Sequence, residues 1–566
     1  MIECPPGAIL LLGGMLAIFF RGAARYIAVV ASTMSMAALW IAPMTSWEWS
    51  SLGLPLQLVR VDQYSFPFAV IFHIAAVIAS VYAMHVRDWM QHAAGMIYAA
   101  AAIGAACAGD LVTLFVYWEL TAVSSVLLIW ARRTEAARAA GMRYLIVQVA
   151  SGVLLLTGAV MQYSSTGSIT FNNFLIDGEP SPAGWLVLAA FGIKAAFPLL
   201  HNWLQDSYPQ ATATGTVYLS AFTTKLAIYA LIRGFAGFEP LIVVGCIMTL
   251  FPIVFAVIEN DLRRVLAYSL NNQLGFMVVG VGIGTELAIN GTVAHAFCHI
   301  IYKSLLFMSM GAVLHRVGTT RATELGGLYK SMPWTTAFCI IGAASIAGFP
   351  LLSGFVSKSM IITAAAEEHL IGVWIVLLIA SAGVMEHSGI KIPFFAFFGH
   401  DSGKRVREAP LNMLLAMGGA AALCIGLGLA YPMLYRILPF AETLHYLPYT
   451  TAHVINQLQL LAFAALAFLV LWKTGLYPEE KRAINLDIDV VYRRWIPAWW
   501  SNTRDIVSRM DTAWRNDATS TLNELIEGLR GSFGPAGVWG RTWSSSTMAF
   551  YASLLLAVCL LLYYSG

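Results

Sequence analysis

Ionisable side chains occur inside apolar segments that are long enough to cross a membrane. The stretch "FVYWELTAVSS" (115–125) places Glu119 in the middle of the apolar run 111–131. An ionised acid at the centre of a membrane helix costs about 2.5–3.5 kcal/mol on insertion scales, so Glu119 must be neutral, paired with a cation or hydrated. The other ionisable residues inside such runs are Lys194, Lys225, His295, His299, Lys303, Lys358 and Lys391.

Three of these residues form one stripe. His295, His299 and Lys303 are spaced four residues apart, so they share one face of a helix. They span roughly 12 Å at 1.5 Å per residue. A single histidine in an apolar segment is usually a satisfied core residue, whereas two histidines and a lysine in one stripe indicate a path for protons. A zinc pair formed by His295 and His299 lacks a visible third ligand, so we expect no metal.

The alternative for each lysine is that its stem lies in the membrane while its ammonium group reaches the interface. Lys391 fits this alternative best, because a basic loop follows it closely. Glu119, Lys225 and Lys303 fit it less well, because apolar residues flank them on both sides. We therefore leave it open whether Lys391 is buried or reaches the interface, and we expect the other residues to be buried.

Composition places the chain in the membrane. Of 566 residues, 59% are hydrophobic and only 11% are charged, and the mean hydropathy is +0.72. Soluble proteins carry roughly a quarter charged residues. Seven cysteines are scattered singly without a CxxC pair, which argues against a metal or iron–sulfur site. We expect an all-α polytopic membrane protein with no cofactor and no nucleic-acid partner.

Hydropathy predicts about sixteen membrane spans of near twenty residues each. They are expected at 7–20, 24–43, 64–86, 91–109, 111–131, 141–163, 183–205, 211–233, 240–258, 262–283, 287–314, 333–365, 371–399, 411–437, 452–473 and 545–564. Lysine and arginine gather in alternate loops, which is the positive-inside pattern. This pattern predicts a multi-pass membrane protein with both termini outside, and we expect it in a bacterial inner (plasma) membrane.

Two spans contain residues that interrupt helices beside a lysine. Pro198 follows Lys194 in "KAAFPLLHNW", and Gly348 and Pro350 precede Lys358 in "IAGFPLLSGFVSK". A proline inside the membrane frees a carbonyl that protein or water must satisfy. The repeated "FPLL" fits a transporter built from two inverted repeats, with spans 7 and 12 broken.

The chain divides into five expected regions. They are N-terminal spans with a periplasmic loop (1–63), a core (64–440), an additional span (441–475), a cytoplasmic-side amphipathic helix (476–544) and a terminal span (545–566). The first two regions together contain about fourteen spans. Apolar residues from Ile506 to Leu529 recur at helical spacing opposite charged ones. This pattern predicts a helix that lies along the membrane surface.

Several motifs together resemble a known family. They are "YWEL" with Glu119, "HNWLQDS" after Lys194, "TTKLAIYALIR" with Lys225, "HIIYKSLLF" with His299 and Lys303, and "GFPLLSGFVSK" with Lys358. Their order and spacing resemble the antiporter-like proton-pumping subunits of Mrp-type cation/proton antiporters, respiratory complex I and membrane-bound hydrogenases. The D subunit of Mrp-type antiporters is the most similar.

The resemblance implies a proton path through Glu119, Lys194, Lys225, His299, Lys303 and Lys358, to which the residue pattern adds His295 and Lys391. It also implies an amphipathic helix that holds neighbouring subunits together, lipid contacts, and transport of protons and Na⁺ within a hetero-oligomer. The expected function is a subunit of a multi-subunit cation/proton antiporter. The same module in a redox-driven pump and a stand-alone structural or bicarbonate-uptake subunit remain alternatives.

Overall fold

The computed structural model describes residues 4–41, 44–51, 54–478, 481, 485 and 487–565. They form two compact units, Met1–Asn485 and Leu486–Gly566. Three of the expected regions contain residues that lie outside the described ones. They are 1–3, 42–43 and 52–53 in the region 1–63, then 479–480, 482–484 and 486 in the region 476–544, and residue 566 of the terminal span. Each unit is therefore described by itself.

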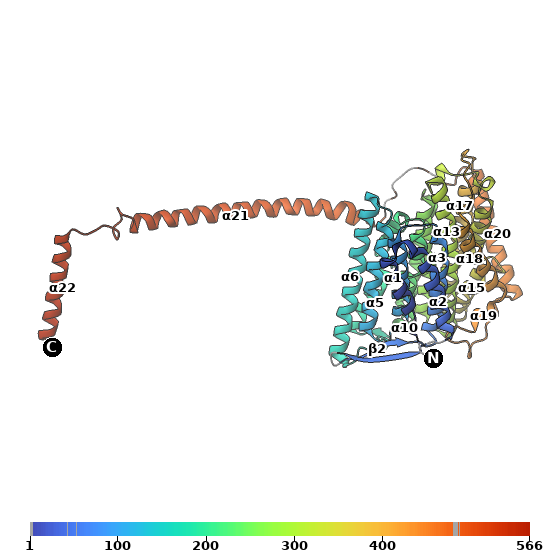
Figure 1. Cartoon of the computed structure of the whole chain (residues 1–566), viewed down its shortest axis with the longest axis horizontal. Helices are drawn as coiled ribbons and strands as arrows, with labels where there is room; N and C mark the ends of the chain where they lie inside the picture. The colour runs from blue at the N-terminus through green and yellow to red at the C-terminus, as the bar shows by residue number, and fades with distance from the viewer. Residues whose placement is uncertain are drawn as a thin grey trace. The chain divides into compact units, whose positions relative to one another are not determined.

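The first unit is a bundle of long helices that run side by side, and a β-hairpin lies across one end of it (Figure 1). Its N-terminal helices are α1 Ala8–Phe19, η1 Arg21–Ala23, α2 Ala24–Ile41, α3 Ser65–Ala83, α4 Trp89–Ala106, α5 Leu111–Trp130 and α6 Glu135–Thr166. The central helices are α7 Pro182–Lys194, α8 Asn202–Ser207, η2 Tyr208–Gln210, α9 Gly215–Ala221, α10 Thr223–Phe235, α11 Pro240–Ile258, α12 Leu262–Ile283 and α13 Glu286–Val317.

The remaining helices of this unit contain two π-helical segments. They are η3 Ala322–Glu324, η4 Leu328–Lys330, α14 Pro333–Ala347, α15 Ser353–Glu367, α16 Ile371–Val384, η5 Met385–Ile390, α17 Lys391–Pro393, η6 Phe394–Phe398, α18 Leu411–Leu429, α19 Tyr431–Tyr435 and α20 Thr451–Lys473. The π-helices are η5 and η6. A buried apolar core runs from α1 to the loop after α19.

Each expected span coincides with a helix or with a run of short helices. Within the described residues, eleven helices are long and apolar enough to cross a membrane, and three shorter apolar helices are α1, α7 and α14. The all-helical membrane fold is confirmed. The total of about sixteen crossings and the inverted-repeat symmetry stay predictions.

Spans 7 and 12 are broken as predicted. Between α7 and α8 the chain passes through positive φ angles at Ala196 (60°) and Leu199 (70°). Between α14 and α15 it does so at Gly348 (79°) and Leu351 (74°). Residues other than glycine seldom adopt this left-handed conformation, so the surrounding structure must hold both breaks in place.

Two interruptions were not predicted. Span 8 is divided at Phe222, which separates α9 from α10 with φ −103° and ψ −70°. Span 13 changes from α-helix to π-helix after Val384. Neither stretch contains a proline at the point of change, which is the signal that marked spans 7 and 12.

Within the described residues, four short strands lie in the connecting segments. β1 (Ser46–Ser51) pairs antiparallel with β2 (Leu54–Arg60), with a bulge between Trp47 and Glu48. β3 (Leu175–Ile176) pairs with β4 (Glu179–Pro180). The backbone N–H of Gln57 on β2 donates to Asp110 Oδ2 at 2.8 Å, which ties the hairpin to the start of α5.

The second unit contains η7 (Val491–Trp495), α21 (Ile496–Phe533) and α22 (Ser545–Ser565). The expected amphipathic helix lies within α21, which is 38 residues long and has no buried residue. Its exposed apolar side chains include Ile506, Met510 and Trp514. The helix itself agrees with the sequence pattern, and its attachment to neighbouring subunits stays a prediction.

Candidate functional site

Lys194 is the last residue of α7, directly before the break in span 7. Its side chain is fully buried. Its Nζ donates to the carbonyl oxygen of Trp118 at 2.6 Å and to Thr121 Oγ1 at 2.9 Å, both on α5. It also lies 4.4 Å from the centre of the Trp118 ring. The break therefore places a buried ammonium group against the helix that carries Glu119.

Glu119 is only half-buried, on the face of α5 that meets α6. A Cβ atom at Gly152 of α6 would overlap the Glu119 carboxylate, so the absence of a side chain there makes room for the acid. Glu119 and Lys194 are close enough for their charges to interact. Within the described chain, Glu119 Oε1 is nevertheless buried without a hydrogen-bond partner.

The break at Phe222 creates the environment of Lys225. In a continuous helix the carbonyl oxygen of Ser220 would accept a hydrogen bond from the backbone N–H of the residue four positions later. Here the Nζ of Lys225 donates to it at 2.5 Å. Lys225 is fully buried, so its hydrogen bond to a helix break satisfies an otherwise free carbonyl inside the bundle.

The predicted stripe on α13 faces Lys225. The ionisable groups of Lys225, His299 and Lys303 are close enough to interact electrostatically. Among the described residues, both ring nitrogens of His299 and the Nζ of Lys303 are buried without a hydrogen-bond partner. Buried polar atoms of this kind are usually satisfied by ordered water. The structure thus brings three of the predicted residues together around unused hydrogen-bonding groups.

His295 extends this cluster toward α15. Its ring lies 6.2 Å from that of His299, and its Nδ1 is 3.1 Å from Ser357 Oγ. Its Nε2 is 3.5 Å from the hydroxyl of Tyr302, which donates to Gln273 Oε1 at 3.2 Å. Tyr302 and Gln273 were not predicted, although the seven-residue spacing from His295 places Tyr302 on the same helix face.

Lys358 occupies the break in span 12. Its Nζ donates to the carbonyl of Ile346 at 3.1 Å and lies 5.2 Å from the centre of the Phe276 ring. The next carbonyl, that of Ala347, accepts from Gln457 Nε2 of α20 at 3.0 Å. Two donors from different helices therefore share the open end of α14.

Lys391 is buried rather than exposed at an interface. Its Nζ donates to the carbonyls of Ala256, Val257 and Glu259 at 3.1, 2.5 and 2.8 Å, at the C-terminus of α11. A cation at this position satisfies free carbonyls and interacts favourably with the helix dipole. Lys391 thus caps α11 in the observed conformation.

His387 was not predicted from the sequence. It lies on η5, and the charges of Lys303, Lys358 and Lys391 all act on it. Its Nδ1 is 2.8 Å from Ser388 Oγ, and its Nε2 is buried without a partner among the described residues. Its position four residues before Lys391 was the available signal. His387 connects Lys391 electrostatically with the rest of the cluster.

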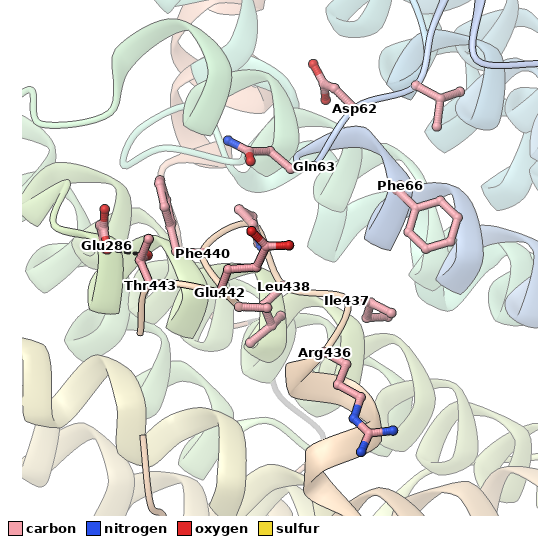
Figure 2. A pocket seen from close by; sticks show the side chains of 13 residues that line it. Asp62, Gln63, Phe66, Glu286, Arg436, Ile437, Leu438, Phe440, Glu442 and Thr443 are labelled. Carbon is pink, nitrogen blue, oxygen red and sulfur yellow. Dashed lines mark hydrogen bonds between the residues drawn. The ribbon is translucent and has the colours of Figure 1, made fainter. Parts of the chain in front are cut away.

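A hollow of about 660 Å³ lies where α13 begins. Figure 2 shows Glu286, Phe440 and Thr443 on one side of it and Asp62 and Phe66 on the other. Asp62 is already paired with an arginine of α10, at 2.7 Å, and Glu286 Oε2 accepts from the Thr443 hydroxyl at 2.8 Å. The hollow is separate from the buried lysines. No group of three or more potential metal ligands occurs in the described ranges.

The chain is similar to a family of membrane transport subunits. Residues 108–385 match the family model "NADH:quinone oxidoreductase/Mrp antiporter, TM". The chain is 32% identical over 353 residues to the D subunit of a Na(+)/H(+) antiporter from Alkalihalophilus pseudofirmus, and the match covers 59% of this chain and 71% of that protein.

Two solved structures share the fold. One is the Mrp complex from a Dietzia species, with a TM-score of 0.76 and 24% identity over 89% of this chain and 60% of that one. The other is the membrane-bound sulfane sulfur reductase, an archaeal respiratory membrane complex, with a TM-score of 0.71 and 22% identity over 98% and 99% of the two chains. Given the matched D subunit and the shared helical core, the chain belongs to the family of antiporter-like membrane subunits shared by NADH:quinone oxidoreductases and Mrp antiporters.

Proposed function

We propose that this chain is the proton-translocating subunit of a multi-subunit Mrp-type cation (Na⁺)/H⁺ antiporter. The observation that carries the proposal is the series of ionisable groups inside the bundle, from Glu119 on α5 to Lys391 on α17. Within the described residues, several of these groups have buried polar atoms without a hydrogen-bond partner. The similarity to an antiporter D subunit favours this function. Na⁺ is the exchanged ion in this proposal because that relative is named as part of a Na⁺/H⁺ antiporter.

The proton path runs through Glu119, Lys194, Lys225, His295, His299, Lys303, Lys358 and Lys391. Glu119 and Lys194 act as a switch, because pairing with the lysine favours the ionised acid and burial favours the neutral one. Lys225 is the central carrier, and the α13 stripe leads onward to Lys358. Ordered water bridges the gaps at His299 and Lys303, where polar atoms have no protein partner among the described residues.

The alternative function is proton pumping in a redox-driven complex of the membrane-bound hydrogenase or NADH/quinone oxidoreductase type. The near full-length structural match to a chain of a respiratory membrane complex favours it. The same buried residues would then move protons, while partner subunits would hold the electron carriers. The nature of the neighbouring subunits distinguishes the two functions, and the chain itself is a transport subunit in both.

Partner subunits are expected to cover the outer face of α5. Glu119 lies at the edge of the α5–α6 contact and is only half-buried, and Val116 and Val123 on the same side of α5 are 56% and 52% exposed. A carboxylate in contact with lipid is costly, so a protein surface suits this face better than lipid does. We place the assembly in a bacterial inner membrane with both termini outside, following the distribution of basic residues.

The first prediction concerns Glu119. Replacing it by alanine (Glu119→Ala) is expected to reduce cation-driven proton movement to background, because the switch loses its acid. Insertion and stability should be retained, since a buried charge is removed. Proton uptake in everted vesicles containing the whole complex measures this, with Glu135→Ala at the exposed start of α6 as the control. Near-wild-type antiport by Glu119→Ala would refute the switch.

The second prediction concerns Lys225. Both Lys225→Ala and Lys225→Arg should lose transport, because arginine keeps its charge but does not release a proton in proteins. The control substitution is Lys330→Arg, because Lys330 is an exposed lysine that forms an ion pair with Asp401. Transport by the Lys225→Arg complex would show that this position supplies only a fixed positive charge.

The third prediction separates two roles of Lys391. Lys391→Met leaves three carbonyls without their donor, and each buried unsatisfied group costs about 1–3 kcal/mol. The thermal unfolding temperature of the solubilised complex should therefore fall. Lys391→Arg should restore folding, because a guanidinium group also donates to carbonyls, but it should not restore proton transport. An arginine variant that transports normally would limit Lys391 to capping α11.

The fourth prediction concerns the C-terminal region. We propose that α21 attaches this subunit to its neighbours and that α22 packs against another subunit through small residues such as Ser546 and Ala549. Deleting residues 480–566 should leave the core folded but should weaken its association with partners. Native gels of the solubilised complex measure this. Full co-migration and normal transport of the truncated chain would mean that α21 merely lies on lipid.

A further inference from the structure

One face of α6 carries polar or small residues at helical spacing. Tyr144, Gln148 and Gly152 are four residues apart, so they lie on one face. This face is buried, whereas Ile146 and Val153 on the opposite side are 62% and 58% exposed. α6 packs against α5, α7 and α8. The buried polar face therefore lies between these helices.

Both ends of this face are marked by ionisable groups. At one end, Arg143 Nε donates to Asp206 Oδ2 at 2.7 Å, and the arginine side chain is 36% exposed, so this ion pair meets the surface of the unit. At the other end, Gly152 abuts the carboxylate of Glu119. The face thus leads from an ion pair at the surface of the unit to the proposed switch acid.

Gln148 lies between these two ends and is fully buried. Within the described structure, neither its amide nitrogen nor its amide oxygen has a hydrogen-bond partner. Burying an amide without hydrogen-bond partners is unfavourable. Among the described residues, both polar atoms of this side chain remain unsatisfied.

The neighbouring helix α8 also carries buried amide atoms without a hydrogen-bond partner among the described residues. Gln205 is 2% exposed, and among the described residues both of its amide atoms lack a partner, as does Asn202 Oδ1. Other polar residues of the region are satisfied: the Tyr144 hydroxyl is 2.7 Å from Ser125 Oγ, and Ser151 Oγ donates to the Ala190 carbonyl. Unsatisfied amides on two packed helices are the setting in which buried water is found.

We propose that a water-filled passage along α6 connects the Arg143–Asp206 pair to Glu119, with Gln148 as its central hydrogen-bonding residue. Water held between Gln148 and the α8 amides passes protons to and from the Glu119 carboxylate. This proposal rests on the proposed function, because it supplies the route by which the switch exchanges protons with one side of the membrane. It adds Gln148, Gln205 and Asn202 to the residues of that route.

Cysteine accessibility in the full complex tests the passage without relying on transport. Gln148→Cys should react with a small water-soluble methanethiosulfonate reagent, detected by mass spectrometry of the peptide that contains residue 148. The matched control is Leu155→Cys, because Leu155 lies on the same helix, is equally buried and belongs to the apolar core. Equal labelling of both positions, or no labelling of residue 148, would overturn the proposal.

Transport provides the second measurement. Gln148→Met keeps the volume but removes the hydrogen-bonding groups, and it should slow proton movement by about tenfold or more, as expected when a proton relay is lost. Gln148→Asn should recover part of the rate.

Labelling and transport together separate the two proposals. If Glu119→Ala stops transport while Gln148→Met does not and residue 148 stays unlabelled, the passage is refuted and the proposed function stands. If residue 148 is labelled but Glu119→Ala transports normally, the water is present and the proposed function fails.

Discussion

Backbone carbonyls released inside a membrane protein need a donor, and in this structure buried lysines provide it. Lys225 donates to Ser220 at the break of span 8, and Lys358 donates to Ile346 at the break of span 12. Lys391 does the same for the end of α11. Lipid offers no hydrogen bonds, so each break and its lysine stabilise one another. The fold can keep costly cations in its interior because it also keeps open helix ends there.

In the proposed mechanism, this arrangement connects proton transfer with helix geometry. A carbonyl oxygen accepts a hydrogen bond from an ammonium group more strongly than from a neutral amine, because a charged donor strengthens the bond. When a lysine releases its proton, the bond that holds the helix end weakens. Neighbouring ammonium groups such as Lys225 and Lys303 also repel one another in a medium of low dielectric constant. Changes of protonation at one position therefore alter both the charge and the backbone contacts of the next.

The amino-acid sequence predicts the parts of the site that depend on chemical type and regular spacing. Acids and lysines stand out against an apolar background, and the histidine stripe follows from four-residue spacing. Proline and glycine mark the breaks in spans 7 and 12. The break at Phe222 has neither residue at the point of change, and the π-helix that carries His387 has glycines but no proline there, so the pattern that marks spans 7 and 12 does not find them. Gly152 was invisible for a similar reason, since its importance lies in the acid that it faces across a helix interface.

The hydrogen bond between Gln457 and Ala347 links α20 to the chemistry of Lys358. Gln457 donates to the carbonyl of Ala347, which is next to the Ile346 carbonyl that accepts from Lys358. A displacement of α20 that broke this bond would offer Lys358 a second acceptor and would favour its protonated form. By reciprocity, the proton on Lys358 must then influence where α20 prefers to lie. In the proposed mechanism, α20 would therefore couple a movement at the edge of the bundle to the proton occupancy of Lys358.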